Sequence, residues 1–314
     1  MTEEYNRFTY SRWKWMLKTL PVACLAMLSL PGCQNDEIAS KEVETPLVIA
    51  TGVGVVPSRA VVTGNTLPNG SQIGVTVVDE TGTGYQEQNY ENVCYTSSKN
   101  SEGAQVWSTT TPVMLSGESG TLYAYYPWRE DVDMENITID LMEDEVIDWM
   151  YAQKVSDLTN QNAHAQVKMN HALAMMDISL MKGNFVGEGK VTSISLTSNT
   201  AAMAATLNAK TGKLSNVLNA GSKLVYTVDE TLSDEPVNLH LLFVPTEQEA
   251  NIKIDVIVDD RNFTATTSNK VTTQSGQSYS YTLVQHSTKL EVSQVTVTPW
   301  NDNPQGELDT EKVK

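Results

Sequence analysis

The chain has few of the residues from which most catalytic and metal sites are built. It contains three cysteines and four histidines, and its 38 Asp and Glu outnumber 21 Lys and Arg, which gives a formal net charge of −17 over 314 residues. A protein with this negative charge repels nucleic-acid phosphates and anionic lipid headgroups. We therefore expect no nucleic-acid partner. Its main apolar run, residues 20–32, is too short for a permanent membrane-spanning helix.

Chemical motifs are also missing. The chain has no HExxH pair, no GxSxG elbow and no phosphate-cradling glycine loop. The histidines are not spaced for zinc, and His240 in "NLHLL" fits a half-buried strand position better than a ligand. We therefore predict no catalytic residues, no cofactor and no metal site, and we do not expect an enzyme. The histidines are His164, His171, His240 and His286.

Two weaker patterns each leave an alternative open. Asp131, Asp133 and Glu135 alternate in a way that can converge oxygens on calcium, but the glycine and distal glutamate of a calcium loop are absent, which favours a solvated acidic loop. The aromatic residues between Tyr123 and Trp128 suit either a sugar-stacking platform or core packing, and core packing is the default in a strand.

The N-terminus is typical of an exported lipoprotein. A basic start is followed by "LPVACLAMLSLPG" and then Cys33, as in a secretory signal. "LPGC" resembles the bacterial lipobox, in which the cysteine is acylated. We therefore expect a signal peptide over residues 1–33, a lipid at Cys33 that anchors the protein to the outer membrane, and a polar tether over residues 34–46. The alternative is an ordinary signal peptide that happens to contain cysteine. Loss of four basic and two acidic residues with the signal changes the net charge from −17 to −19.

Cys94 is then the only thiol of the mature chain, because Cys24 lies in the signal and Cys33 carries lipid. One thiol forms no intramolecular disulfide, and its apolar surroundings favour a buried, inert side chain. Stability must therefore come from burial of apolar surface.

From Thr45 onward the pattern is that of strands and turns. Short segments rich in Val, Ile, Thr and Tyr alternate with Gly, Asn, Asp and Ser clusters, as in β-sandwiches. Residues 252–267 alternate, turn at "DDRN" and return, which predicts a hairpin. "GTLYAYYPW" predicts a strand that ends at Pro127. At most one short helix is expected, near the acidic centre of residues 135–154.

Several separated segments resemble the fimbrillin family of Bacteroidales-type (type V) pili. They are "SRA", "GSQIGVTV", "LYAYYPW", "DWMYA", "VKMNHALAMMDISL", "GQSYSYTL" and a final strand ending in "TPW". The resemblance implies an all-β fold of two tandem β-sandwich domains of transthyretin-like, Greek-key type. We expect the domains to cover residues 47–164 and 165–314. It further implies a cell-surface or fimbrial location and a structural role in adhesion.

The resemblance also implies a mechanism of assembly. In the family an arginine-specific protease removes the lipidated tether together with the first strand, and the matching bond here is Arg59–Ala60. The displaced strand would place Leu47, Ile49, Val53 and Val55 on one side. Its loss would leave an apolar groove with unpaired backbone groups, which a strand from another pilus subunit fills. The alternative is that Arg59 is a strand-edge residue and that no protease cuts after it.

A stalk subunit also needs a strand to donate. The segment after Trp300 is polar and acidic, so the candidate donor is "LEVSQVTVT", with Leu290, Val292, Val295 and Val297. Otherwise the chain is a tip subunit, a lipid-retaining anchor subunit, or a surface lipoprotein that binds glycans and never polymerises.

Overall fold

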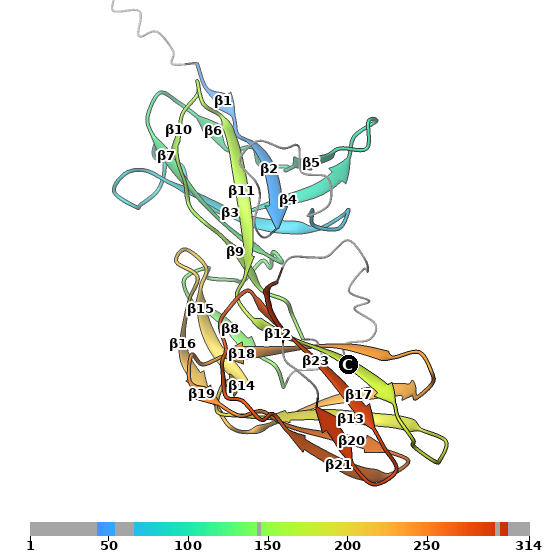
Figure 1. Cartoon of the computed structure of the whole chain (residues 1–314). Helices are drawn as coiled ribbons and strands as arrows, with labels where there is room; N and C mark the ends of the chain where they lie inside the picture. Colours follow the sequence, from blue (N-terminus) through green and yellow to red (C-terminus); the bar gives the residue numbers. More distant parts are fainter. Residues whose placement is uncertain (1–42, 54–65, 143–145, 293–295, 301–314) are drawn as a thin grey trace, which may run out of the picture. The chain divides into compact units, whose positions relative to one another are not determined.

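The computed structural model describes residues 43–53, 66–142, 146–292 and 296–300, all within one unit of the chain, residues 42–314 (Figure 1). Every regular element in these ranges is a β-strand, so the predicted all-β class is confirmed. The acidic centre of residues 135–154, where one short helix is expected, includes residues 143–145, which lie outside the described residues. The described part of residues 135–154 forms β8 (Ile137–Asp140) and β9 (Met150–Ala152). Across the described ranges, no helix is long and apolar enough to cross a membrane.

The first sheet collects strands from the N-terminal half of the chain. Aliphatic and aromatic side chains from most of these strands pack against one another and form the core of this sheet. β10 (Val155–Leu158) pairs with β7, and the short β1 (Thr45–Pro46) pairs separately with β6 (Met114–Leu115). In spatial order the sheet is β2 (Val48–Val53), β11 (His164–His171), β9, β7 (Gly120–Tyr126), β3 (Gln72–Val78), β4 (Tyr90–Lys99) and β5 (Gln105–Ser108).

Two further sheets share one core and form a β-sandwich. The larger sheet runs β14 (Ala201–Ala202), β18 (Val237–Pro245), β12 (Ala174–Lys182), β23 (Gln277–Gln285) and β24 (Leu290–Val292), with β25 (Thr296–Pro299) also on β23. The smaller runs β17 (Lys223–Thr231), β13 (Lys190–Thr197), β20 (Lys253–Val258) and β21 (Arg261–Thr266).

Local sequence signals account for several of these elements. β20 and β21 form the predicted hairpin, and its turn residues Asp259 and Asp260 both have positive φ, as a two-residue turn of the right twist requires. Ile254, Val256 and Val258 are fully buried, in the period of two that was expected. β7 ends at Tyr126, directly before Pro127.

A small sheet links segments that lie far apart in the sequence. Its order is β16 (Lys213–Leu218), β15 (Ala204–Asn208) and β8, and a separate two-stranded sheet pairs β19 (Glu249–Ala250) with β22 (Val271–Thr272). A third apolar cluster covers the small sheet, and includes Ile137, Trp149 and Trp300.

The pairing of the strands indicates where the first expected domain ends and the second begins. Residues 164–171 form β11, which pairs with β2 and β9 in the first sheet, whereas β12 begins the strands of the sandwich at Ala174. The sequence placed the boundary near residue 165. We propose that the domains meet between His171 and Ala174, where the chain changes sheets.

Cys94 lies on β4, is a free thiol and is only half-buried, so it is more exposed than expected. Burial raises the pKa of this thiol, which keeps it protonated and weakly nucleophilic.

Candidate functional site: the first strand and its slot

The apolar strand near the N-terminus is built into the first sheet. β2 pairs in parallel with β11, from Val48 opposite His164 to Val53 opposite Met169. The N–H of Leu47 donates to the carbonyl of Val113 at 2.9 Å, and that of Val48 to the carbonyl of Ala163 at 2.8 Å. The strand therefore satisfies backbone groups on several neighbours at once.

Its side chains alternate between the core and the surface. Leu47, Ile49 and Val53 are 6, 4 and 0% exposed, whereas Val48 is 46% exposed. Full burial of an aliphatic side chain stabilises a fold by about 1.5–3 kcal/mol. Val55, the fourth expected member of the strand, lies outside the described residues. β2 and the residue before it, Leu47, thus cover the core of the first sheet with three aliphatic side chains.

β2 also joins the two ends of this sheet. The indole N–H of Trp107 donates to Thr51 Oγ1 at 3.1 Å, and the Thr51 hydroxyl donates to Gln105 Oε1 at 3.0 Å. Trp107 and Gln105 lie on β5, at the opposite end of the strand order from β2. Sequence reasoning missed these residues. The available signal was Thr51 itself, a polar side chain on the same face as Ile49 and Val53.

Arg59 and Ala60 lie outside the described residues, as does Cys33. The chain topology nevertheless sets what a cut would do. Among the described residues, the next strand after β2 is β3, which is not its neighbour in the sheet. Hydrolysis after Arg59 would therefore leave β2 held by non-covalent contacts alone.

The candidate donor segment is paired with its own chain. The strand expected over Leu290–Thr298 is described on both sides of residues 293–295, as β24 and β25, and both parts pair antiparallel with β23. Leu290 is buried, Val292 is half-buried and Val297 is 50% exposed. Val295 lies outside the described residues.

The described C-terminal segment ends in a buried aromatic anchor that sequence reasoning also missed. The Trp300 ring stacks on His171, with 3.5 Å between ring centroids and 10° between planes. His171 Nδ1 lies 2.9 Å from an oxygen of Asp148. The backbone N–H of Trp300 donates to the carbonyl of Gly276 at 2.8 Å. Since His171 ends β11, the strand that carries β2 also carries a contact to Trp300.

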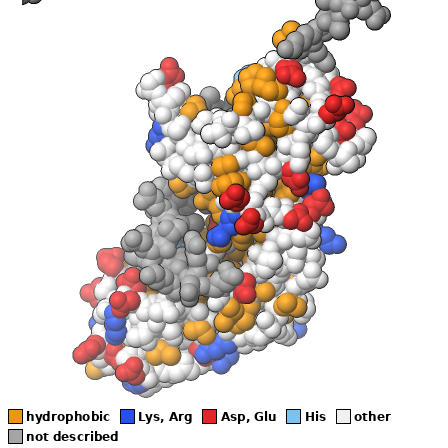
Figure 2. Space-filling view, turned by 180° about the vertical axis from the view of Figure 1, so that it is seen from behind, with side chains coloured by type: hydrophobic (Ala, Val, Ile, Leu, Met, Phe, Trp, Pro, Cys, Tyr) orange, Lys and Arg blue, Asp and Glu red, His pale blue; other side chains and the backbone are white. Residues whose placement is uncertain are grey.

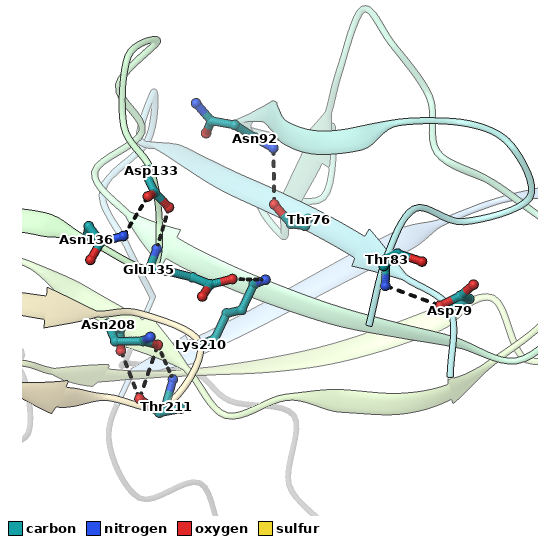
Figure 3. A network of polar contacts seen from close by, with 10 residues as sticks. All are labelled: Thr76, Asp79, Thr83, Asn92, Asp133, Glu135, Asn136, Asn208, Lys210 and Thr211. Carbon is teal, nitrogen blue, oxygen red and sulfur yellow. Dashed lines mark hydrogen bonds and ion pairs between the residues drawn. The ribbon is translucent and has the colours of Figure 1, made fainter. Parts of the chain in front are cut away.

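Two of the three alternating acidic residues, Asp133 and Glu135, make contacts that hold the local fold (Figure 3). Asp133 accepts hydrogen bonds from the Asn136 amide at 2.7 Å and the Glu135 backbone N–H at 2.9 Å, and these bonds hold its pKa below the usual value. Glu135 pairs with Lys210 at 2.5 Å. Within the described ranges, no group of three or more His, Cys, Asp or Glu is arranged to hold a metal ion.

The aromatic residues around Tyr123 pack in the core rather than forming an open row. Tyr125 is fully buried, and Tyr123 and Trp128 are partly buried against the third cluster. Figure 2 shows Asp and Glu side chains spread over the visible face among Lys and Arg, as expected for an acidic chain.

The described residues form an all-β protein whose apolar first strand is built into the first sheet and is followed in the sequence by a connection that contains Arg59. A family model described as fimbrillin-like matches residues 58–300. The chain belongs to this fimbrillin-like family, and the resemblance noted in the sequence is confirmed. The matched region starts beside Arg59 and leaves out β1 and β2.

Solved structures share the fold. A candidate cell adhesion protein of Bacteroides uniformis is 20% identical, with a TM-score of 0.63, and the match covers 82% of this chain and 99% of that one. One from Bacteroides ovatus is 17% identical, with a TM-score of 0.64 and coverage of 82% and 98%. One from Bacteroides fragilis is 14% identical, with a TM-score of 0.50 and coverage of 84% and 100%. No curated protein sequence matches the chain.

Proposed function

We propose that the chain is a structural pilus subunit that serves cell adhesion. Its membership of the fimbrillin-like family supports a fimbrial or adhesion subunit at the cell surface. The observation that carries the finer proposal is the position of β2. This strand pairs with β11 at one end of the first sheet and contacts β5 at the other end, yet one connection, which contains Arg59, joins it to the strands that follow.

The proposed route begins with export as a lipoprotein, held at the outer membrane through Cys33. An arginine-specific protease then hydrolyses the Arg59–Ala60 bond, and the segment with β1 and β2 leaves. This loss uncovers the apolar core beneath Leu47, Ile49 and Val53, and it leaves the edge of β11 unpaired. A strand from another pilus subunit fills the slot by pairing with β11, because an open apolar edge is unstable in water.

The candidate donor strand is paired within its own chain, and this suggests a second candidate function. To act as a donor, Leu290–Thr298 must leave β23, which uncovers Leu290 but little of Val297. Because Trp300 is also buried in its own chain, the structure suits a tip subunit that accepts a strand and donates none. A lipid-retaining anchor or a glycan-binding lipoprotein would keep β2, and the buried Tyr125 offers no sugar platform.

The proposal is tested by treating the purified chain with an arginine-specific protease. We expect the wild type to be cut after Arg59 and to form oligomers, and Arg59→Gln to stay uncut there and monomeric. Arg129→Gln is the matched control, because it removes another arginine and keeps the connection. Cleavage after Arg59 without oligomers would favour the tip subunit, whereas resistance at Arg59 would refute processing.

A further inference from the structure

One strand edge of the small sheet is unoccupied among the described residues. β8 pairs with β15 on one side only, with Ile139 opposite Ala205 and Thr138 opposite Thr206. The N–H of Leu141 donates to the carbonyl of Met203 at 2.9 Å, and this bond shows which residues of β8 direct their backbone groups toward β15. By the alternation of an antiparallel pair, the backbone groups of Thr138 and Asp140 therefore face away from β15.

A cavity of about 310 Å³ runs along this open edge. Apolar side chains of Leu141, Ile147 and Trp149 form part of its lining, and Asp131, Asp133 and Asp140 outnumber the one cation, Arg129. The loop before β8 is held by the Asp133–Asn136 hydrogen bond and the Glu135–Lys210 ion pair, so this wall is built without an added ligand (Figure 3). An edge beside a cavity of this volume suits an extended peptide that is apolar on one face and basic on the other.

The sequence contains such a segment after Trp300. Trp300, where the described residues end, belongs to the same apolar cluster as Ile137, Ile139 and Trp149. The sequence continues to "TEKVK" at residues 310–314, after a connection of residues 301–309 that holds Pro304 and Gly306. Nine extended residues span up to about 30 Å, which is ample for a return to β8, and Pro and Gly favour the necessary turn.

The alternation of this segment matches that of β8. In β8, Ile137 and Ile139 are buried and Thr138 and Asp140 are exposed. In a paired strand, Val313 would share the face of Ile139, and Lys312 and Lys314 would share the face of Asp140. The two lysines would then lie among the three aspartates of the lining, where opposite charges attract.

We propose that residues 310–314 add to β8 of the same chain as a further strand. The site is thus an interaction surface for the chain's own C-terminal tail. It does not depend on cleavage after Arg59 or on strand exchange between subunits.

The first test measures hydrogen exchange of the Thr138 and Asp140 amides in the full chain. The triple variant Lys312→Glu, Val313→Asp and Lys314→Glu should speed their exchange by about tenfold or more, because the added ladder protects these two amides. Asp302→Asn with Glu307→Gln is the matched control in the same tail and should exchange like the wild type. Equal exchange in the wild type and the triple variant would overturn the proposal. Unchanged protection of the β20–β21 hairpin shows that the fold is intact.

The second test identifies the chain that supplies the tail. A mixture of isotopically heavy and light chains is treated with a carbodiimide, which joins lysine to nearby carboxylates. We expect Lys312 or Lys314 to be linked to Asp131, Asp133 or Asp140 in all-light and all-heavy pairs. Mixed pairs would show that a second copy occupies the edge, and absence of these links would show that the tail does not. Either result contradicts the proposal.

Discussion

The indole N–H of Trp107 donates a hydrogen bond to Thr51 Oγ1 at 3.1 Å, and this contact joins the first strand to the far end of the sheet that it completes. Thr51 passes the bond on to Gln105, also on β5. β2 is therefore more than an added edge strand. β2 pairs with β11 and contacts β5 through Thr51. Removal of β2 would therefore expose both ends of the sheet.

Thr51→Val tests this bridge, because it keeps the shape of the side chain and removes the hydroxyl. A hydrogen bond of this kind contributes about 0.5–1.5 kcal/mol, so we expect the free energy of unfolding of the uncut chain to fall by about 1 kcal/mol. Urea denaturation measures the loss. Thr227→Val, at an exposed position of β17, is the control and should change stability little. An equal effect of both substitutions would contradict the bridge.

The core contribution of β2 is tested by a pair of neighbouring substitutions. Ile49→Ala removes a side chain that is 4% exposed, and large-to-small changes in cores cost about 2–5 kcal/mol. Val48→Ala alters a half-exposed side chain and should cost under about 1 kcal/mol. The difference should be seen in thermal unfolding of the uncut chain and should vanish after the first strand is removed. Similar costs in the uncut chain would mean that Ile49 does not pack as described.

Trp300 is expected to hold the described end of the chain against β11. Trp300→Ala removes a buried ring stacked on His171, and such a change costs about 3–5 kcal/mol. Trp300→Phe keeps an aromatic face toward His171 and should recover part of the loss. Melting temperatures of the three proteins measure the effect. An unchanged melting temperature in Trp300→Ala would show that the ring is not anchored.

Acid should weaken the sandwich through Asp255. Burial alone raises the pKa of this carboxyl, but hydrogen bonds from Thr264 and Lys253 and the nearby charges of Lys253 and Lys223 more than offset it, so its pKa lies below the usual value for an aspartate. A carboxyl with a depressed folded-state pKa stabilises the fold above its unfolded-state pKa, and this contribution is lost as the pH falls through the folded value. Asp255→Asn should therefore be less stable than the wild type near about pH 7, and the difference should shrink below about pH 3.8.

Denaturant titrations across this pH range measure that difference. Asp229→Asn is the control, since Asp229 is exposed and its pair with Lys190 lies at the surface, where ion pairs contribute about 0–1 kcal/mol. A gap between the wild type and Asp255→Asn that stays constant down to the acid limit would contradict the assignment.

The sequence predicted the parts of this fold that depend on neighbouring residues. The β20–β21 hairpin follows from alternation and two aspartates at the turn, and the end of β7 follows from Pro127. The inward side of residues 47–53 follows from a period of two. Each of these signals lies within a few residues of its effect.

Other features depend on partners far along the chain. The parallel pairing of β2 with β11 joins residues more than a hundred positions apart, and no local pattern records it. The pairing of Ile137–Asp140 with Ala204–Leu207 likewise joins segments that lie far apart in the sequence. The stack of Trp300 on His171 also joins residues that lie far apart in the sequence.

The central claim, that the first strand is removed and another strand takes its place, is tested most directly on protein from its native cell surface. The measurement is the intact mass together with the N-terminal sequence. Processing as proposed predicts a chain that begins at Ala60, carries no lipid and lacks β1 and β2. A chain that begins at an acylated Cys33 would contradict the claim, and would make the protein a lipid-retaining anchor or a stand-alone surface lipoprotein.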